Sequence, residues 1–197
     1  YRTTGKGRET AMCGIVGYIG KKRACGVLIE GLKRLEYRGY DSAGVCVSSG
    51  EALHIRKATG RVAEVEALAC ADATIQAGTC GIAHTRWATH GEPNEVNAHP
   101  HCNHDNRIAV VHNGIIENYL TLKQFLVSKG CVFRSQTDTE VLSHLISEFY
   151  EDGADSLEEA VQAALREVSG TYGIAVVCSD EPDKIGRASC RERVYHP

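Results

Sequence analysis

A cysteine follows the only methionine of the chain, and this pair is the first place where the sequence could support nucleophilic chemistry. Removal of Met12 would leave Cys13 as the first residue. A free α-amine has a pKa of about 7.7–8.0, and a cysteine thiol one of about 8.5. The amine could then accept the thiol proton, so that one residue supplies both nucleophile and base. Taken alone, a cysteine at the edge of a strand is more often structural than catalytic.

A second group of reactive side chains follows an apolar run that ends at Thr85. Arg86, Trp87, Thr89 and His90 offer a guanidinium, an indole, a hydroxyl and an imidazole within one loop. Arginine is suited to bidentate capture of a carboxylate, such as the α-carboxylate of an amino acid. The alternative is an arginine paired with a surface acid beside a tryptophan in the core.

A third group could stabilise negative charge and bind an ammonium. The side-chain amide of Asn113 and the backbone N–H of Gly114 could donate to one oxyanion, although Asn-Gly is also typical of a plain turn. Asp138 could hold a substrate ammonium, or could only complement a helix dipole. Together with Cys13 and Arg86, these groups suit hydrolysis of the side-chain amide of an amino acid.

The segment around residue 100 is rich in metal-ligating residue types. His99, His101, Cys102 and His104 invite a zinc interpretation, but their spacing matches no standard zinc site and no second ligand pair accompanies them. We therefore expect no metal and no cofactor.

The hydrophobic periodicity predicts the elements that must position these groups. Strands are expected over residues 13–19, 43–47, 52–57, 79–85, 108–112 and 172–178, and helices over 23–36, 62–75, 119–129, 138–150 and 156–168. Thr137 and Glu140 have the spacing of a capping box. A long irregular stretch, 87–106, separates two strands, as functional loops do. This pattern predicts a layered α+β domain.

Composition excludes several classes of protein. The 197 residues carry a net charge of −3, which argues against a wide nucleic-acid footprint. No stretch approaches the roughly 20 apolar residues of a membrane span. The nine cysteines are odd in number and contain no C-x-x-C spacing, so we expect free thiols in a reducing cytoplasm rather than a disulfide framework.

The two ends differ in character from the part between them. Residues 1–12 are expected to be a leader that is absent from the mature protein. Residues 185–197 lack a helical or alternating period and resemble a translated sequencing adapter, so we expect a foreign tail. The domain is then 13–184, truncated at its C-terminal end.

At these residues the chain resembles the class II, or N-terminal nucleophile, glutamine amidotransferases. The segments that carry the resemblance are Met12-Cys13-Gly14-Ile15-Val16-Gly17, Leu35 to Gly44, His84 to Pro93, Val96 to His101, Val111 to Asn118 and Thr137 to Glu140. Their order and spacing span the whole of 13–184. The segment 37–44 and the loop 84–91 resemble the branch of the family whose nitrogen acceptor is a sugar phosphate.

The resemblance implies a four-layer αββα sandwich, with its last strands missing here, and hydrolysis of glutamine through a cysteine thioester. It implies these roles: Cys13 as nucleophile, Asn113 and Gly114 as oxyanion hole, Arg86 with Thr89 and His90 at the α-carboxylate, Asp138 at the α-ammonium, Trp87 at the mouth, and Arg38 ordering the nucleophile. With residues 1–12 attached, the nitrogen of Cys13 is an amide, and this form is expected to be inactive.

The resemblance also implies partners outside this chain. Ammonia would pass to fructose 6-phosphate on C-terminal isomerase domains that are absent here, in a full-length homo-oligomer without nucleic-acid or membrane partners. The alternatives are the glutaminase domain of another class II enzyme, such as amidophosphoribosyltransferase, or an inactive fragment.

Overall fold

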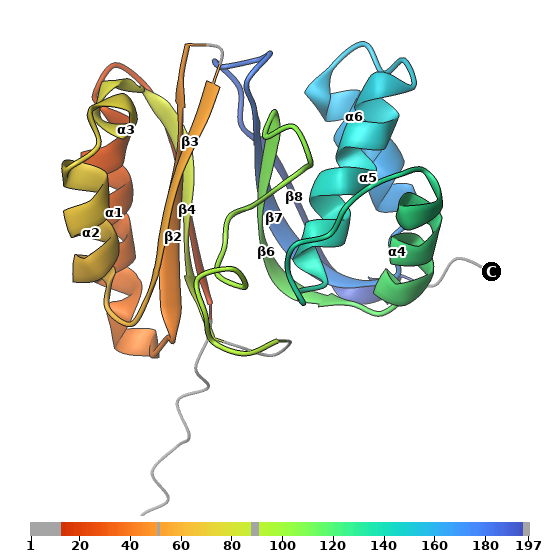
Figure 1. Cartoon of the computed structure of the whole chain (residues 1–197), viewed down its shortest axis with the longest axis horizontal. Helices are drawn as coiled ribbons and strands as arrows, with labels where there is room; N and C mark the ends of the chain where they lie inside the picture. The colour runs from red at the N-terminus through yellow and green to blue at the C-terminus, as the bar shows by residue number, and fades with distance from the viewer. Residues whose placement is uncertain (1–12, 51, 88–90, 195–197) are drawn as a thin grey trace, which may run out of the picture.

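The computed structural model describes residues 13–50, 52–87 and 91–194, which form two antiparallel sheets between two layers of helices. Figure 1 shows the four layers, with α1, α2 and α3 outside one sheet and α4, α5 and α6 outside the other. The α+β class and the αββα layering expected from the sequence are confirmed.

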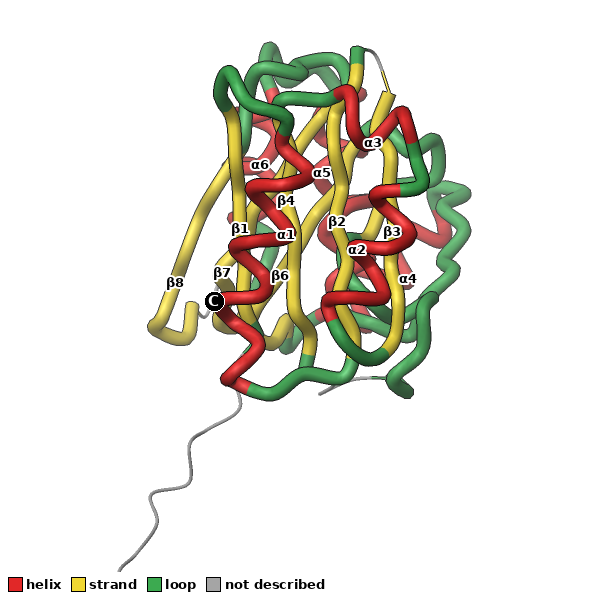
Figure 2. The backbone as a smooth tube through the Cα atoms, turned by 90° about the vertical axis from the view of Figure 1, so that its left-hand side faces the viewer, coloured by secondary structure: helices red, strands yellow, loops and turns green. Residues whose placement is uncertain are grey.

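The first sheet has the strand order β1-β4-β2-β3, and all its pairs are antiparallel. Its strands are β1 (Gly14–Ile19), β2 (Ser42–Ser49), β3 (Ala52–Thr59) and β4 (Cys80–Arg86), and its helices are α1 (Ala24–Leu35), α2 (Val62–Cys70) and α3 (Ala73–Ala77), with a 3-10 turn η1 (Glu36–Arg38). Figure 2 shows α1 and α2 lying across the outer face of this sheet. Helix α1 forms there because Leu28, Ile29 and Leu32 recur on one face and are buried.

The second sheet has the order β5-β6-β7-β8, again antiparallel. Its strands are β5 (His101–Cys102), β6 (Ile108–Ile116), β7 (Gly170–Cys178) and β8 (Gly186–Val194), and its helices are α4 (Tyr119–Ser128), α5 (Thr139–Glu151) and α6 (Leu157–Arg166). Ser156 caps α6 by accepting a hydrogen bond from the Glu159 N–H.

The layer between the two sheets is built from small and medium-sized side chains. Its buried members are Cys46, Cys80, Ile82, Ala109, Val111, Ala175 and Val177. One larger buried cluster lies between each sheet and the helices that cover it. Cysteines 46, 80 and 178 are buried, which confirms that they act as small hydrophobic residues.

One predicted helix was wrong in extent. The expected helix over 62–75 is two helices, α2 and α3, with a break at Ala71 and Asp72. The Asp72 carboxylate accepts a hydrogen bond from the Thr74 N–H at 2.9 Å and pairs with Arg56. This side-chain cap begins a new helix where the periodicity alone predicted continuation.

The segment between β4 and β6 is irregular, as expected, and contains only the short strand β5 among its described residues. It packs against β2 at Gly44, where an added Cβ would lie 2.1 Å from the His99 carbonyl oxygen. Asn97 joins this segment to the chain before α5, because its Nδ2 donates to Gln136 Oε1 and its Oδ1 accepts from the Gln136 N–H. The loop is therefore held between the two sheets.

Strand β8 lies in the segment for which the sequence showed no period. It pairs with β7 from Gly170↔Val194 to Val176↔Gly186, with an irregularity near Tyr172. The expectation that 185–197 is foreign to the domain stays a prediction. Within the described ranges, every helix is too short or too polar to cross a membrane.

Candidate active site

Residues from both sheets line a cavity of about 320 Å³. Six of the nine predicted site residues lie on its wall: Cys13, Arg86, Trp87, Asn113, Gly114 and Asp138. The other described residues on the wall are His99, His112, Thr137 and Thr139. The fold thus brings together a thiol, a guanidinium, an amide and a carboxylate that are up to 125 positions apart in the sequence.

The thiol of Cys13 faces the end of β4. Its Sγ accepts a hydrogen bond from the Trp87 N–H at 3.1 Å. Burial raises the pKa of this thiol and the Asp41 carboxylate raises it further, while the Trp87 N–H and the Arg86 guanidinium lower it, with a net upward shift. The Cys13 thiol is therefore neutral at pH 7, and it would require a base to become a thiolate.

Asn113 and Gly114 lie inside strand β6, so the interruption of this strand after residue 112 was a wrong prediction. They pair with Gly173 and Tyr172 of β7. Gly114 has φ +137°, and an added Cβ would lie 2.0 Å from the Thr171 carbonyl oxygen, so only glycine fits there. The Asn113 amide Nδ2 donates to the Cys13 carbonyl oxygen at 3.1 Å.

The backbone direction of β6 can be followed from its last residue. The Ile116 N–H turns away from β7 and donates to Asp138 Oδ2 at 2.9 Å. Successive N–H groups of an antiparallel strand point to alternate sides, so the Gly114 N–H, two residues earlier, is expected on the same open side. Asn113 and Gly114 could then both donate to one oxygen atom in the cavity.

Arg86 is buried, with 3% of its surface exposed, at the end of β4. Its Nη1 lies 3.8 Å from Asp41 Oδ1, and its Nη2 donates to the Gly91 carbonyl oxygen at 3.3 Å. Trp87 is 47% exposed, so it is not the core residue of the alternative interpretation. Thr89 and His90 lie outside the described residues, as does the side chain of Arg38.

Asp138 is buried at the start of α5, and the capping box predicted beside it was wrong. The Glu140 carboxylate does not return to Thr137; it accepts hydrogen bonds from the backbone N–H groups of Arg134 and Ser135. The hydroxyl of Thr137 bonds instead to His101 Nε2 at 3.0 Å. The turn before Asp138 is thus fixed by buried side chains rather than by a reciprocal cap.

The sequence did not indicate the layer of threonines and histidines at the cavity wall. The Thr139 hydroxyl bridges His99 Nε2, at 2.9 Å, and His112 Nδ1, at 3.0 Å. His84 lies 4.2 Å from His99 between ring centroids. The available signal was a histidine inside an otherwise apolar strand, such as His84 after Gly81-Ile82-Ala83. The hydrogen bonds between threonines and histidines thus fix Thr137 and Thr139, the residues directly before and after Asp138.

Comparison with known proteins identifies the family. The sequence model of a glutamine amidotransferase domain matches residues 84–187, which is more than half of the chain. The chain belongs to the glutamine amidotransferase family. Within that family it is 55% identical over 174 residues to the glutamine–fructose-6-phosphate aminotransferase (isomerizing) of Clostridium tetani, and 57% identical over 176 residues to the protein of that name from Chlorobaculum tepidum. Each match covers 88% of this chain.

Solved structures agree with this amidotransferase fold at lower identity. The glutamine phosphoribosylpyrophosphate amidotransferase of B. subtilis, complexed with ADP and GMP, matches with a TM-score of 0.68 and 29% identity. The match covers 84% of this chain and 35% of that one. The amidotransferase chain spans only about 28% of the length of the curated relatives it matches.

Acid is expected to destabilise this amidotransferase domain through its buried histidines. Burial lowers the pKa of His84 from 6.5 to about 4 and that of His101 to about 3. Below pH 6.5 the unfolded chain therefore binds more protons than the folded one. The contribution of the neutral histidines to the free energy of unfolding is fully present above pH 6.5, and it is lost as the pH falls through 6.5 toward 4. At about pH 5, His84 alone lowers the free energy of unfolding by about 2 kcal/mol relative to neutral pH.

Urea unfolding of the chain at about pH 7.5 and about pH 5 measures this loss. The His101→Gln variant should show a smaller difference between the two pH values than the parent. His54→Gln, on the edge strand β3, is the matched control and should keep the parent difference. Equal stability of the parent at both pH values would contradict the expectation.

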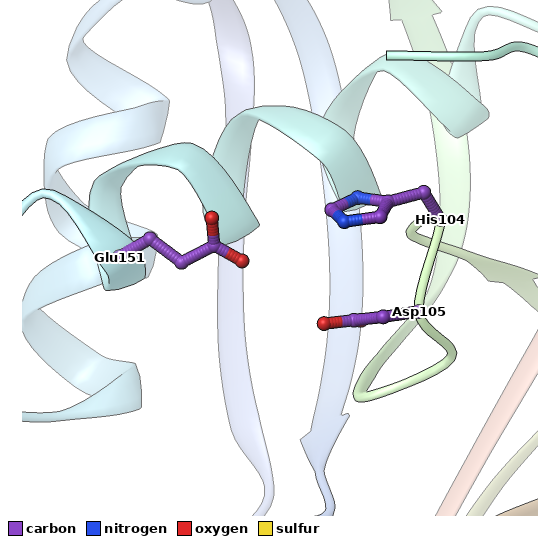
Figure 3. Close-up of side chains that lie close together, drawn as sticks. All are labelled: His104, Asp105 and Glu151. Carbon is purple, nitrogen blue, oxygen red and sulfur yellow. The ribbon is translucent and has the colours of Figure 1, made fainter. Parts of the chain in front are cut away.

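The histidines of the zinc interpretation do not converge on one point. His99 and His101 bond to threonines of the cavity wall, whereas His104 lies with Asp105 and Glu151 on the surface (Figure 3). Ligand atoms of these three exposed residues lie within 4.8 Å of one another. The Arg107 guanidinium pairs with both carboxylates, at 2.7 Å for Glu151. Ion pairing with Arg107 accounts for this acidic cluster, and we propose no metal there.

Proposed function

We propose that the cavity hydrolyses the side-chain amide of L-glutamine to glutamate and ammonia through a thioester on Cys13. The observation that carries this proposal is the convergence of Cys13, Arg86, Asn113 and Asp138 on one cavity in a chain of the glutamine amidotransferase family. Arg86 would bind the α-carboxylate and Asp138 the α-ammonium, so the amide carbon lies beside Cys13 Sγ. Thr89, His90 and Arg38 are proposed to assist at the carboxylate and the nucleophile.

The reaction would proceed in two acyl-transfer steps. The α-amine of Cys13 takes the thiol proton, and Sγ attacks the amide carbon to form a tetrahedral oxyanion. Asn113 Nδ2 and the Gly114 N–H donate to that oxyanion. The protonated amine then gives its proton to the leaving nitrogen, and ammonia departs. A water molecule, deprotonated by the same amine, hydrolyses the thioester and releases glutamate.

The test uses the chain beginning at Cys13, which retains every described residue. We expect equal amounts of glutamate and ammonia from glutamine. Hydroxylamine should divert the acyl group to γ-glutamyl hydroxamate, because a thioester reacts with this stronger nucleophile. Cys13→Ala is the matched control and should give neither product. Release of ammonia by Cys13→Ala at the parent rate would overturn the thioester proposal.

For the whole protein, we propose transfer of the ammonia to fructose 6-phosphate to form glucosamine 6-phosphate. The support is the identity of 53–57% to three relatives named glutamine–fructose-6-phosphate aminotransferase, against 29% for the phosphoribosylpyrophosphate enzyme. We also propose that 13–184 is the glutaminase domain of a homo-oligomeric cytoplasmic enzyme, and that 1–12 and 185–197 are extrinsic to it. Sequencing the source DNA beyond codon 184 tests this: a frame that continues into two sugar-isomerase domains supports the proposal, and a frame that continues into a phosphoribosyl-type domain overturns it.

A further inference from the structure

His84 joins the two sheets directly beneath the cavity. It lies in β4, where it pairs with Ile15 of β1 and Gly44 of β2, and only 1% of its surface is exposed. Its Nε2 lies 2.7 Å from Oδ1 of Asn113, which belongs to β6 of the other sheet. His84 itself does not line the cavity wall, so any effect of His84 on the cavity is exerted through its contact with Asn113.

The orientation of the Asn113 amide follows from its second partner. Nδ2 lies 3.1 Å from the Cys13 carbonyl oxygen, which can only accept a hydrogen bond. Nδ2 must therefore face Cys13, and Oδ1 must face His84. Since Oδ1 only accepts, the Nε2 of His84 must carry the proton. One N–H of Nδ2 bonds to the Cys13 carbonyl, and among the described residues the other has no partner, so it can donate into the cavity.

We propose that His84 is a positioning residue that fixes the side-chain amide of Asn113 with its N–H groups toward Cys13. This proposal rests on the proposed glutaminase function. A half turn of the amide would place Oδ1, an acceptor, where the tetrahedral oxyanion requires a donor. The Nε2–H of His84 opposes that half turn, because the turned amide would set two donors against each other.

The surroundings of His84 keep the imidazole in this role. The ring packs against His99, with 33° between the ring planes, and His99 is held in turn by the Thr139 hydroxyl. Burial lowers the pKa of His84 to about 4, so the ring is neutral at pH 7 and carries a single proton. With that proton on Nε2, His84 stabilises the same orientation of Asn113 that the Cys13 carbonyl oxygen requires.

The first measurement is the tautomer of His84 in the intact chain of residues 1–197, by ¹⁵N NMR at neutral pH. His84→Phe identifies its signals by their loss. We expect protonated Nε2. Protonated Nδ1 would overturn the proposal, and this readout does not depend on whether the protein hydrolyses glutamine.

The second measurement is the kinetics of the chain beginning at Cys13. His84→Phe keeps a ring but removes the donor, and we expect kcat to fall by about 10²-fold, since a small misplacement of a catalytic group has an effect of this size. KM should change little. His84→Gln restores a donor near the position of Nε2 and should recover most of kcat. A kcat for His84→Phe within twofold of the parent would overturn the proposal.

The double variant His84→Phe with Asn113→Ala separates positioning from general damage. If His84 acts through Asn113, the double variant should be no slower than Asn113→Ala alone. Fully multiplicative losses would overturn the proposal. If the parent itself releases no glutamate, the proposed function fails, while the tautomer measurement still decides the orientation of Asn113. If His84→Phe does not fold, His84→Gln identifies the His84 signals by their loss, and the tautomer then decides.

Discussion

The chain beginning at Cys13 is expected to hydrolyse glutamine at least about 10²-fold faster than the chain of residues 1–197, because general base catalysis contributes about 10²–10⁴-fold. Burial raises the pKa of the Cys13 thiol, so little thiolate forms without a base. On the described part of the cavity wall, His99 and His112 each bond to the Thr139 hydroxyl through one ring nitrogen, and burial lowers the pKa of both imidazoles, which makes them weaker bases. We propose the α-amine of Cys13, with a pKa of about 7.7–8.0, as the base. An amide nitrogen in its place has no basic lone pair.

A matched control isolates the amine from all other effects of the preceding residues. The addition of a single alanine before Cys13 converts its amine into an amide and adds only one small residue, against the twelve residues of 1–12. This chain should be as slow as the chain of residues 1–197. Glutamate release is measured for all three forms under identical conditions. If the chain with the added alanine is as active as the one beginning at Cys13, the base lies elsewhere in the protein.

The fold was largely predictable because its elements carry strong local periodicity. Helix α1 and the hairpin of β2 and β3 have clear apolar patterns and lie where expected. The breaks were harder to predict, because they depend on single side chains. Asp72 divides α2 from α3 because its carboxylate accepts hydrogen bonds from the Thr74 N–H and hydroxyl, and β6 continues through Asn113 and Gly114 because β7 pairs with them. Tertiary pairing thus overrode a local turn signal.

The sequence predicted which reactive side chains line the cavity, but not the contacts that hold these side chains in place. Cys13, Arg86 and Asp138, taken together, have functional groups that suit amide hydrolysis. The supporting contacts join residues that are far apart in the chain, such as His84 with Asn113 across the two sheets. A sequence without aligned relatives contains no local pattern for such pairs. Only the packing of the two sheets brings them together.

Replacement of Asn113 by alanine is expected to lower kcat by about 10²–10³-fold, the effect of removing one oxyanion-hole donor. The other proposed donor, the Gly114 N–H, is difficult to test by substitution. Any side chain at Gly114 would meet the Thr171 carbonyl oxygen and would have to adopt φ +137°. Asn113 is half-buried, and alanine fits the same strand geometry, so its variant removes the donor while β6 can keep its pairing with β7.

The kinetic constant that changes decides the role of Asn113. A donor that acts only on the tetrahedral oxyanion affects kcat and leaves KM almost unchanged, because the planar amide of glutamine makes less use of it. Asn113→Asp is the informative companion, since it keeps the shape but offers only acceptors. Its carboxylate would repel the oxyanion, and we expect it to be at least as slow as the alanine variant. If instead Asn113→Ala raises KM and keeps kcat, Asn113 binds glutamine in the ground state and the oxyanion hole lies elsewhere.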